Sequence, residues 1–212
     1  MNSFGRRFRV SIFGESHGEL IGVVLDGVPA GLELSDAGFE QDILRRKSGA
    51  KGTTPRIEDD KPMIVSGVYE GHTTGAPLAI VFHNNNTRSA DYSLFDAMPR
   101  PGHADLTAAL KWDDCHDPRG GGHFSGRMTL PVVAAGVVAK KILSDATILD
   151  ETPFSGVNAR IVELGGIADE TQWQAAIDNV IEEEDSKGNK FVRFKPLPAW
   201  ETPEAIMNLL TK

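Results

Sequence analysis

The sequence lacks any long apolar run, and its only cysteine is Cys115. A single thiol excludes an intrachain disulfide framework and fits a reducing compartment. No stretch reaches the roughly 18 apolar residues that a membrane-spanning helix needs. The N-terminal arginines are not followed by the apolar core of a signal peptide, because Phe13–His17 interrupts the only hydrophobic stretch nearby. We therefore expect a cytoplasmic protein with no membrane partner.

An excess of positive charge is also missing, since 22 Lys and Arg face 30 Asp and Glu for a formal net charge of -8. Nucleic-acid binders normally present a basic face, so we expect no nucleic-acid partner. At 212 residues the chain can bury a core as one large domain or two small ones. Basic residues do gather between Arg45 and Arg56, where no acid occurs. This segment predicts a local site for a small anion, although a solvated helix end and loop would look the same.

Hydrophobic periodicity predicts a mixed chain of strands and helices. The expected strands are Phe8–Phe13, Gly22–Asp26, Met63–Val68, Leu78–Phe82, Ile161–Leu164 and Phe191–Phe194. A first helix is expected after a cap at Ser35, with Phe39, Ile43 and Leu44 pointing inward. A second covers Leu130–Leu143, with Thr129 as its cap and Pro131 in its first turn. An amphipathic helix over Asp169–Glu184 and a short helix from Thr202 follow. Because Leu130–Leu143 is apolar on all sides, we expect it to be a buried central helix. The polar segment Asn84–Arg100 is expected to be a long loop.

Two glycine-containing turns present a histidine each. His17 lies in Gly14–Gly18, between two predicted strands, and His103 lies in Arg100–Asp105, where Asp105 opens a helix and is a candidate cap. Histidine is the side chain best suited to exchange protons at neutral pH. The two turns therefore suggest a proton donor and acceptor pair, with solvent-exposed turn histidines as the open alternative.

The segment Arg119–Arg127 contains three consecutive glycines before a predicted helix. Glycines permit close backbone approach, and the start of a helix offers unpaired N–H groups to an anion. Its spacing matches neither a P-loop nor a dinucleotide fingerprint, and a flexible hairpin tip is the alternative. Asp113–Asp117 has contiguous rather than spaced potential ligands, so we assign no metal there. The residues alone thus indicate an enzyme acting on a phosphorylated or carboxylated small molecule.

Taken in order and spacing, these segments resemble the chorismate synthase family. The matching segments are Phe8–Gly18, Asp26–Gly31, the Arg45–Arg56 segment, Arg88–Tyr92, Arg100–Asp105, Arg119–Arg127 and Val133–Gly136. The match is continuous from Phe4 to about Ile167, stops near Lys187 and resumes over Gly188–Pro196. The resemblance implies an α+β fold, a β-α-β sandwich in which two antiparallel sheets enclose helices, assembled as a homotetramer. Residues 1–212 would form a single domain of this type that is incomplete after about residue 187.

The resemblance also implies a reaction, the last step of the shikimate pathway towards aromatic amino acids. Family members eliminate phosphate and a ring proton in the anti-1,4 sense from 5-enolpyruvylshikimate 3-phosphate to give chorismate. They need reduced FMN, although no net redox change occurs, and NADPH is a candidate reductant of the flavin. A substrate with one phosphate and two carboxylates accounts for the basic segment.

Residue by residue, the resemblance implies two catalytic histidines: His17 as a proton donor near the substrate and His103 against the flavin. The implied substrate-binding residues are Ser16, Arg46, Lys51 and Arg127, and the implied flavin-binding residues are His123, Phe124, Ser125, Lys195, Pro196, Leu197, Pro198 and Ala199. The sequence departs from the family pattern in having His123 for the usual arginine, Met128 for glutamate and Lys51 for arginine. A late segment with a catalytic aspartate has no counterpart. A non-catalytic remnant that binds flavin or phosphorylated metabolites, and a flavin reductase, therefore stay as alternatives.

Overall fold

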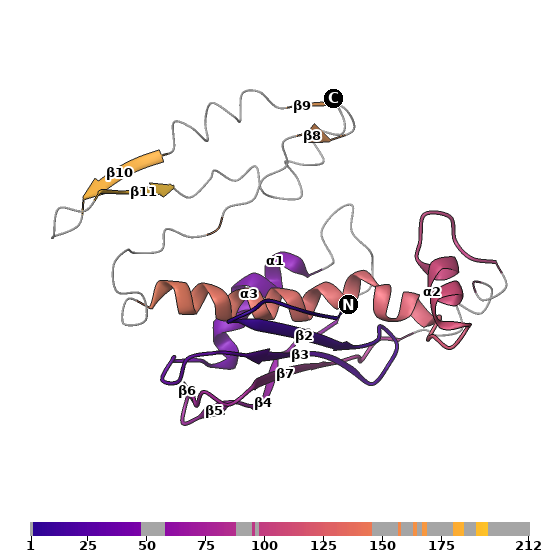
Figure 1. The fold of residues 1–212 in the computed structure, drawn as a ribbon, viewed down its shortest axis with the longest axis horizontal. Coiled ribbons are helices and arrows are strands. Elements are labelled where there is room, and N and C mark those ends of the chain that lie inside the picture. The colour runs from indigo at the N-terminus through magenta and orange to yellow at the C-terminus, as the bar shows by residue number, and fades with distance from the viewer. Residues whose placement is uncertain are drawn as a thin grey trace. The chain divides into compact units, whose positions relative to one another are not determined.

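The structure is a computed structural model that describes part of the chain. The described residues are 2–47, 58–87, 95, 98–145 and 157, together with four short strands between residues 163 and 194. The chain divides into two compact units, Met1–Lys47 with Arg56–Ile142, and Ser48–Pro55 with Leu143–Lys212. The first unit carries a sheet with helices and the residues of the candidate site (Figure 1).

A five-stranded antiparallel sheet forms the frame of the first unit. Its strand order is β1 (Ser3–Phe4), β2 (Arg9–Gly14), β3 (Leu20–Asp26), β7 (Leu78–His83) and β4 (Met63–Ser66). These bounds confirm the strands predicted at Phe8–Phe13, Gly22–Asp26 and Leu78–Phe82. The register pairs Gly14 with Ile21, and Leu20 with His83. The turn after β2 and the chain after β7 therefore leave the sheet at the same end.

The strand predicted over Met63–Val68 is in fact two strands. β4 ends at Ser66, and β5 (Val68–Tyr69) instead forms a hairpin with β6 (His72–Thr73). Gly67 separates them with a φ of 86°, and a Cβ there would lie 2.6 Å from the Cα of Leu78. Only glycine combines this backbone conformation with so close an approach, so the chain turns at that point.

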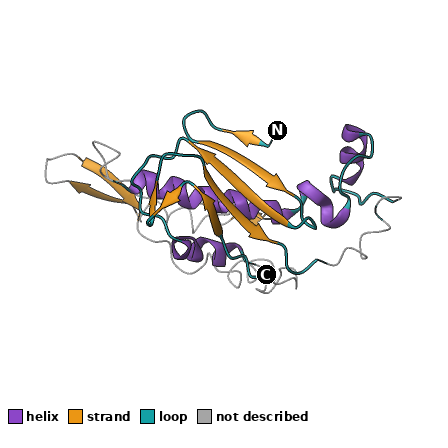
Figure 2. Cartoon of the chain, turned by 90° about the horizontal axis from the view of Figure 1, so that it is seen from below, coloured by secondary structure: helices purple, strands orange, loops and turns teal. Residues whose placement is uncertain are grey.

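Helices pack on one face of the sheet, as the two views together show (Figure 2). They are the 3-10 turn η1 (Asp36–Phe39), α1 (Glu40–Arg46) and α3 (Thr129–Ser144). The core between them and the sheet is fully buried, with Ile21, Val23, Phe39, Ile80, Phe82 and Leu130 at 0% exposure. Phe39 and Ile43 point inward as predicted. Leu44 does not, because it is 57% exposed, and Ser35 makes no side-chain capping bond.

The helix α3 begins at Thr129 and carries Pro131 in its first turn, as the sequence predicts. Its prediction as a helix buried on all sides is wrong for the described part of the chain. Leu130, Ala134 and Val138 are fully buried, whereas Val132 is 41% exposed. The sheet covers a single stripe at helical spacing and leaves the opposite side of the helix open.

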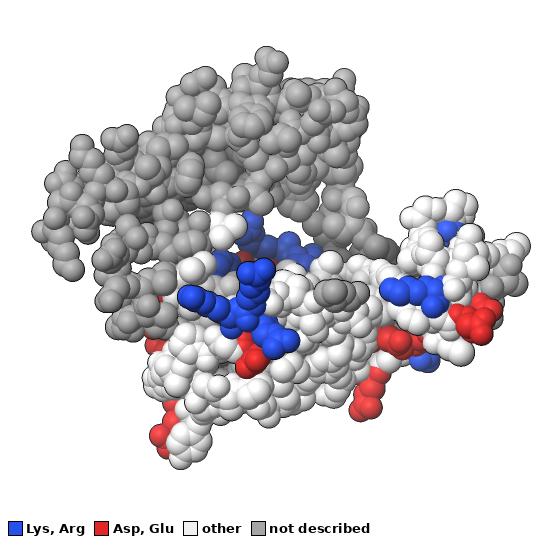
Figure 3. All heavy atoms as spheres, viewed as in Figure 1, with Lys and Arg blue, Asp and Glu red and all other residues white. Residues whose placement is uncertain are grey.

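Three further elements carry site residues. The helix α2 (Asp105–Trp112) begins at the predicted residue, and the 3-10 turns η3 (Arg119–Phe124) and η4 (Gly126–Met128) lead into α3. On the face seen in Figure 3, Lys and Arg side chains of the described residues lie in separate groups beside acidic ones. Within the described residues, no helix is both long and apolar enough to cross a membrane.

The second unit contains two short antiparallel hairpins. They are formed by β8 (Glu163–Leu164) with β9 (Ile167–Ala168), and by β10 (Val180–Glu184) with β11 (Lys190–Phe194). The strand predicted at Phe191–Phe194 is confirmed. The helix predicted over Asp169–Glu184 is wrong at Val180–Glu184, because pairing with β11 supplies the backbone hydrogen bonds that a helix would otherwise make. The short helix expected from Thr202 lies outside the described residues.

Candidate functional site

The three consecutive glycines separate the two turns that carry the candidate histidines. All three have positive φ, at 61°, 80° and 52° for Gly120, Gly121 and Gly122. A Cβ at Gly120 would overlap the imidazole of His17, and a Cβ at Gly121 would lie 2.8 Å from Cε1 of His103. Glycine is thus needed twice over at these positions, for its backbone conformation and for its lack of a side chain. The segment is a packed wedge between two histidines and not a flexible hairpin tip.

The turn after β2 is buried against this wedge. Ser16 is 0% exposed and His17 is 7% exposed, and the backbone N–H of Ser16 donates to the carbonyl of Gly122 at 3.1 Å. The N–H of Gly18 closes the turn by donating to the carbonyl of Glu15, also at 3.1 Å. The alternative of a solvent-exposed turn histidine therefore fails for His17.

His103 lies in a cluster of charged groups at the start of α2. The Arg100 guanidinium donates two hydrogen bonds to Asp105, each 2.8 Å long, and Oδ1 of Asp105 lies 2.6 Å from Nδ1 of His103. The hydrogen bonds from Arg100 hold the pKa of Asp105 well below its usual range, with the charge of His103 acting in the same direction. The N-cap of α2 is Ala104 and not Asp105, whose oxygens bond Arg100 and lie against His103. A carboxylate in this position orients the imidazole and favours a proton on Nδ1.

Two candidate arginines share one buried carboxylate. Asp60, whose side chain is 2% exposed, accepts from Arg127 at 2.8 Å and from Arg46 at 3.2 Å. Arg46 also donates to the hydroxyl of Thr129 at 3.1 Å and to the carbonyl of Gly126 at 3.2 Å. These bonds join the end of α1 to the start of α3. Sequence reasoning missed Asp60, which carries no local signal beyond its place in an acidic tripeptide.

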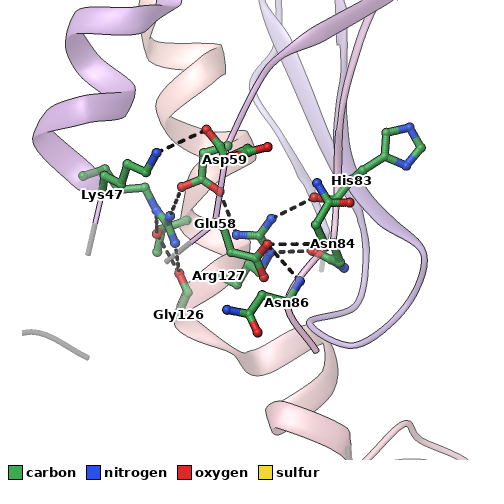
Figure 4. A network of polar contacts seen from close by, with 12 residues as sticks. Lys47, Glu58, Asp59, His83, Asn84, Asn86, Gly126 and Arg127 are labelled. Carbon is green, nitrogen blue, oxygen red and sulfur yellow. Dashed lines mark hydrogen bonds and ion pairs between the residues drawn. The ribbon is translucent and has the colours of Figure 1, made fainter. Parts of the chain in front are cut away.

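Arg127 is buried and connects this pair to the His17 turn (Figure 4). Its guanidinium donates to Asp60, to the carbonyl of His83 at 3.2 Å, and through Nε to the side-chain oxygen of Asn84. The amide nitrogen of Asn84 donates to the carbonyls of Glu15 at 3.0 Å and Gly18 at 2.8 Å. Asn84 was also missed, since the sequence indicates only that it follows a strand.

His123 and Phe124 follow the wedge in the sequence and line a cavity of about 510 Å³. Nδ1 of His123 donates to the carbonyl of Gly14 at 3.1 Å, and its Nε2 lies 3.1 Å from the side-chain oxygen of Asn2. Three aromatic side chains, those of Phe13, Trp112 and Phe124, line the cavity. The rings of Trp112 and Phe124 are in contact, with centroids 5.3 Å apart.

Two carboxyl groups face each other at this cavity. Burial raises the pKa of Glu15, and a hydrogen bond with Asp117 raises it further. Asp117 behaves in the opposite way, because hydrogen bonds from Arg119, 2.8 Å and 2.7 Å long, lower its pKa. The pair therefore divides into a carboxylate at Asp117 and a carboxyl at Glu15 that holds its proton more readily than an isolated glutamate.

Comparisons with known proteins identify the family. The family model for chorismate synthase matches residues 8–198. The chain belongs to the chorismate synthase family. A chorismate synthase of Chitinophaga pinensis is 56% identical over 178 residues, which are 84% of this chain and 51% of the relative. One of Methanocaldococcus jannaschii is 50% identical over 68% of this chain and 38% of the relative. A solved structure described as a crystal structure of chorismate synthase shares 31% identity over 67% of this chain and 36% of that chain, with a TM-score of 0.46.

The chain spans about half the length of the curated chorismate synthases that it matches. Within that half, the structure brings together Ser16 and His17 with the wedge, His103 on its other face, and Arg46 with Arg127 through Asp60. Ser125 lies beside this arrangement, where its hydroxyl accepts from the N–H of Arg127 at 3.4 Å. Of the remaining predicted residues, those outside the described part of the chain are Lys51, Lys195, Pro196, Leu197, Pro198 and Ala199.

Proposed function

We propose that the protein carrying this chain is a chorismate synthase that eliminates phosphate from 5-enolpyruvylshikimate 3-phosphate to give chorismate, using reduced FMN. The observation that carries the proposal is the meeting of both candidate histidines at the glycine wedge, His17 against Gly120 and His103 against Gly121. His17 lies 103 residues before Gly120 in the sequence, and His103 lies 18 residues before Gly121. Membership of the chorismate synthase family supports the same reaction.

The arginine pair supports binding of an anionic substrate. Two guanidiniums, those of Arg46 and Arg127, lie together on the carboxylate of Asp60 at the start of α3. Arginine recognises phosphate and carboxylate groups through paired N–H donors. We assign Arg46, Arg127 and the neighbouring Ser16 to the substrate, together with Lys51.

The two histidines have different surroundings and take different roles. His17 is nearly enclosed and lies next to the hydroxyl of Ser16, so it donates a proton on the substrate side. His103 is oriented by Asp105 through Nδ1, which leaves Nε2 to face Gly121 and to manage protonation at the flavin.

The aromatic cavity fits the ring system of FMN better than its phosphate. Phe13, Trp112 and Phe124 offer flat apolar walls, and His123 lies beside them. Among the described residues that line it, the acidic ones are Glu15 and Asp117, and neither lysine nor arginine is present. The phosphate therefore needs a cation from elsewhere, such as Lys195 in the predicted flavin segment Lys195–Ala199. When bound, reduced FMN lends electron density transiently while the phosphate leaves.

The finer architecture and setting follow the family as proposals. We propose a β-α-β sandwich of two antiparallel sheets enclosing helices, to which residues 1–212 contribute one domain that is incomplete after about residue 187. We further propose a homotetramer in the cytoplasm and NADPH as the source of reducing equivalents. The open side of α3, with Val132 at 41% exposure, supports a layer of structure beyond the sheet described.

The decisive experiment uses the protein of full family length that carries this chain, and it measures phosphate release from 5-enolpyruvylshikimate 3-phosphate without oxygen, with and without reduced FMN. We expect release only with reduced FMN, and a loss of at least about 100-fold in kcat for His17→Ala and His103→Ala. His72→Ala is the matched control, because His72 is exposed on the β5–β6 hairpin. Flavin binding without phosphate release would favour the non-catalytic remnant, and normal turnover of both variants would overturn the assigned roles.

A further inference from the structure

Asn84 makes polar contacts on both sides of its amide. Its nitrogen donates to the carbonyls of Glu15 and Gly18, the residues on either side of Ser16 and His17. Its backbone N–H adds a bond to the carbonyl of Glu19 at 3.0 Å. Asn84 thus adds three bonds to the turn that presents His17, and it follows β7 directly, where the sheet register brings the two segments together.

The other side of the amide is held by Arg127. The side-chain oxygen of Asn84 accepts from Nε of Arg127, whose remaining nitrogens donate to Asp60 and to the carbonyl of His83. Two carbonyls on one side and a guanidinium on the other fix which amide atom is nitrogen and which is oxygen. A carboxylate cannot donate to Glu15 and Gly18, and an aliphatic side chain satisfies neither side.

We propose that Asn84 is a positioning residue for His17, which it holds in place by bonding the Glu15–Gly18 turn to the buried Arg127. The predicted effect on kcat rests on the proposed function. Since Arg127 is assigned to the substrate, Asn84 joins the anion site to the proton donor through one side chain. The imidazole of His17 already packs against Gly120, so a shift of the turn displaces the proton donor and leaves the arginines in place.

Asn84→Asp tests this directly, because it keeps an oxygen towards Arg127 and replaces the donor that faces the two carbonyls. We expect kcat for phosphate release to fall about 10- to 100-fold, since a misplacement near 1 Å has effects of this size. KM for the substrate should also rise, because the new carboxylate lies against Arg127 in the anion site, so the displacement of His17 is read from kcat. Asn85→Asp is the matched control. The Asn85 side chain is exposed, and this substitution makes the same change of charge one residue away. An unchanged kcat, or a raised KM at unchanged kcat, would overturn the proposal.

A second readout separates this inference from the proposed function. Amide hydrogen exchange reports the bond from the N–H of Gly18 to Glu15, and protection there should fall in Asn84→Asp while Val23 in the core strand stays protected. If the wild-type protein of full family length releases no phosphate, the proposed function fails, and this exchange measurement still decides whether Asn84 holds the turn. Unchanged protection of Gly18 would refute it. Should Asn84→Asp not fold, Asn84→Gln keeps both bonding groups on a longer arm and should give an intermediate fall in kcat at unchanged KM.

Discussion

At the scale of single residues, Asp60 combines three uncommon properties. Its side chain is 2% exposed, its φ of 52° lies in the left-handed region, and its two oxygens serve two different arginines. Buried carboxylates are tolerated when they are paired, and removing a partner leaves an uncompensated charge. A backbone conformation that is rare for most residues is retained where the surrounding contacts require it. Asp60 therefore sets the positions of Arg46 and Arg127.

Asp60→Asn should destabilise the protein by roughly 3 kcal/mol, because it leaves Arg127 buried without a counter-charge. Asparagine accepts the left-handed backbone readily, so the change isolates the charge. Urea unfolding monitored by tryptophan fluorescence measures the difference. Asp59→Asn is the control and should change stability by no more than about 0.5 kcal/mol, since Asp59 is exposed. Equal stabilities for the two variants would contradict the role of Asp60.

Asp105 predicts a dependence of stability on pH. Hydrogen bonds from Arg100 lower its pKa in the folded protein, so its contribution is present above the unfolded pKa of about 4 and is lost as pH falls through the folded value. Asp105→Asn should be less stable than the wild type by on the order of 1 kcal/mol at pH 7. The difference should shrink below about pH 4, because the unfolded wild-type chain then takes up a proton at Asp105 that the folded protein does not. Urea midpoints at pH 7 and pH 3 test this, and a difference independent of pH would contradict it.

At the scale of elements, the apolar run of α3 has one buried side and one exposed side. Its residues are almost uniformly apolar from Leu130 to Ala139, yet the sheet covers one stripe only. The hairpin of β10 and β11 shows a second such difference. The apolar spacing before Glu184 matches a helix, but Val180–Glu184 pairs as a strand. Both differences arise because periodicity reports which residues are apolar and not which partner covers them.

The two sides of α3 should respond differently to truncation in this chain. Leu130→Ala should cost roughly 2 to 5 kcal/mol, because Leu130 is fully buried against the sheet. Val132→Ala should cost no more than about 0.5 kcal/mol, because Val132 is 41% exposed. Denaturant unfolding of both variants of the 212-residue chain measures the contrast. A large loss for Val132→Ala would show that another layer covers that side of the helix.

At the scale of the whole molecule, the chain supplies half of the length of the family members that it matches. The described part contains both histidines, the arginine pair and the aromatic cavity. No lysine or arginine is among the described residues that line the cavity. The family's late aspartate has no counterpart in the sequence. The site in this chain is therefore one side of a larger one.

The 212-residue chain purified alone should bind reduced FMN weakly and release little or no phosphate, because cofactor affinity depends on enclosing most of the ligand surface. A protein extended to the full family length should gain at least about 10-fold in FMN affinity, or about 1.4 kcal/mol. Anaerobic titration of FMN fluorescence and intact-mass measurement of the sample test this together. Full activity in a sample of 22.9 kDa would contradict it.

The sequence by itself determined the elements whose signals are local. The strands around His17, the start of α3 at Thr129 with Pro131, and the helix opening at Asp105 follow from short-range periodicity and turn chemistry. Turn composition made the two histidines candidates, and the family resemblance added their roles and those of the arginines, without any indication of how they meet.

Only the tertiary structure decided which residues hold those candidates in place. Asp60 lies 67 residues from Arg127, and Asn84 lies 66 residues from Gly18, so neither pairing has a local signature. The glycine wedge shows the same limit, since its sequence allows a flexible loop and its close contacts with His17 and His103 make it a packed spacer. Long-range contacts depend on sheet register and on which backbone groups remain unpaired, and both are settled only when the chain folds.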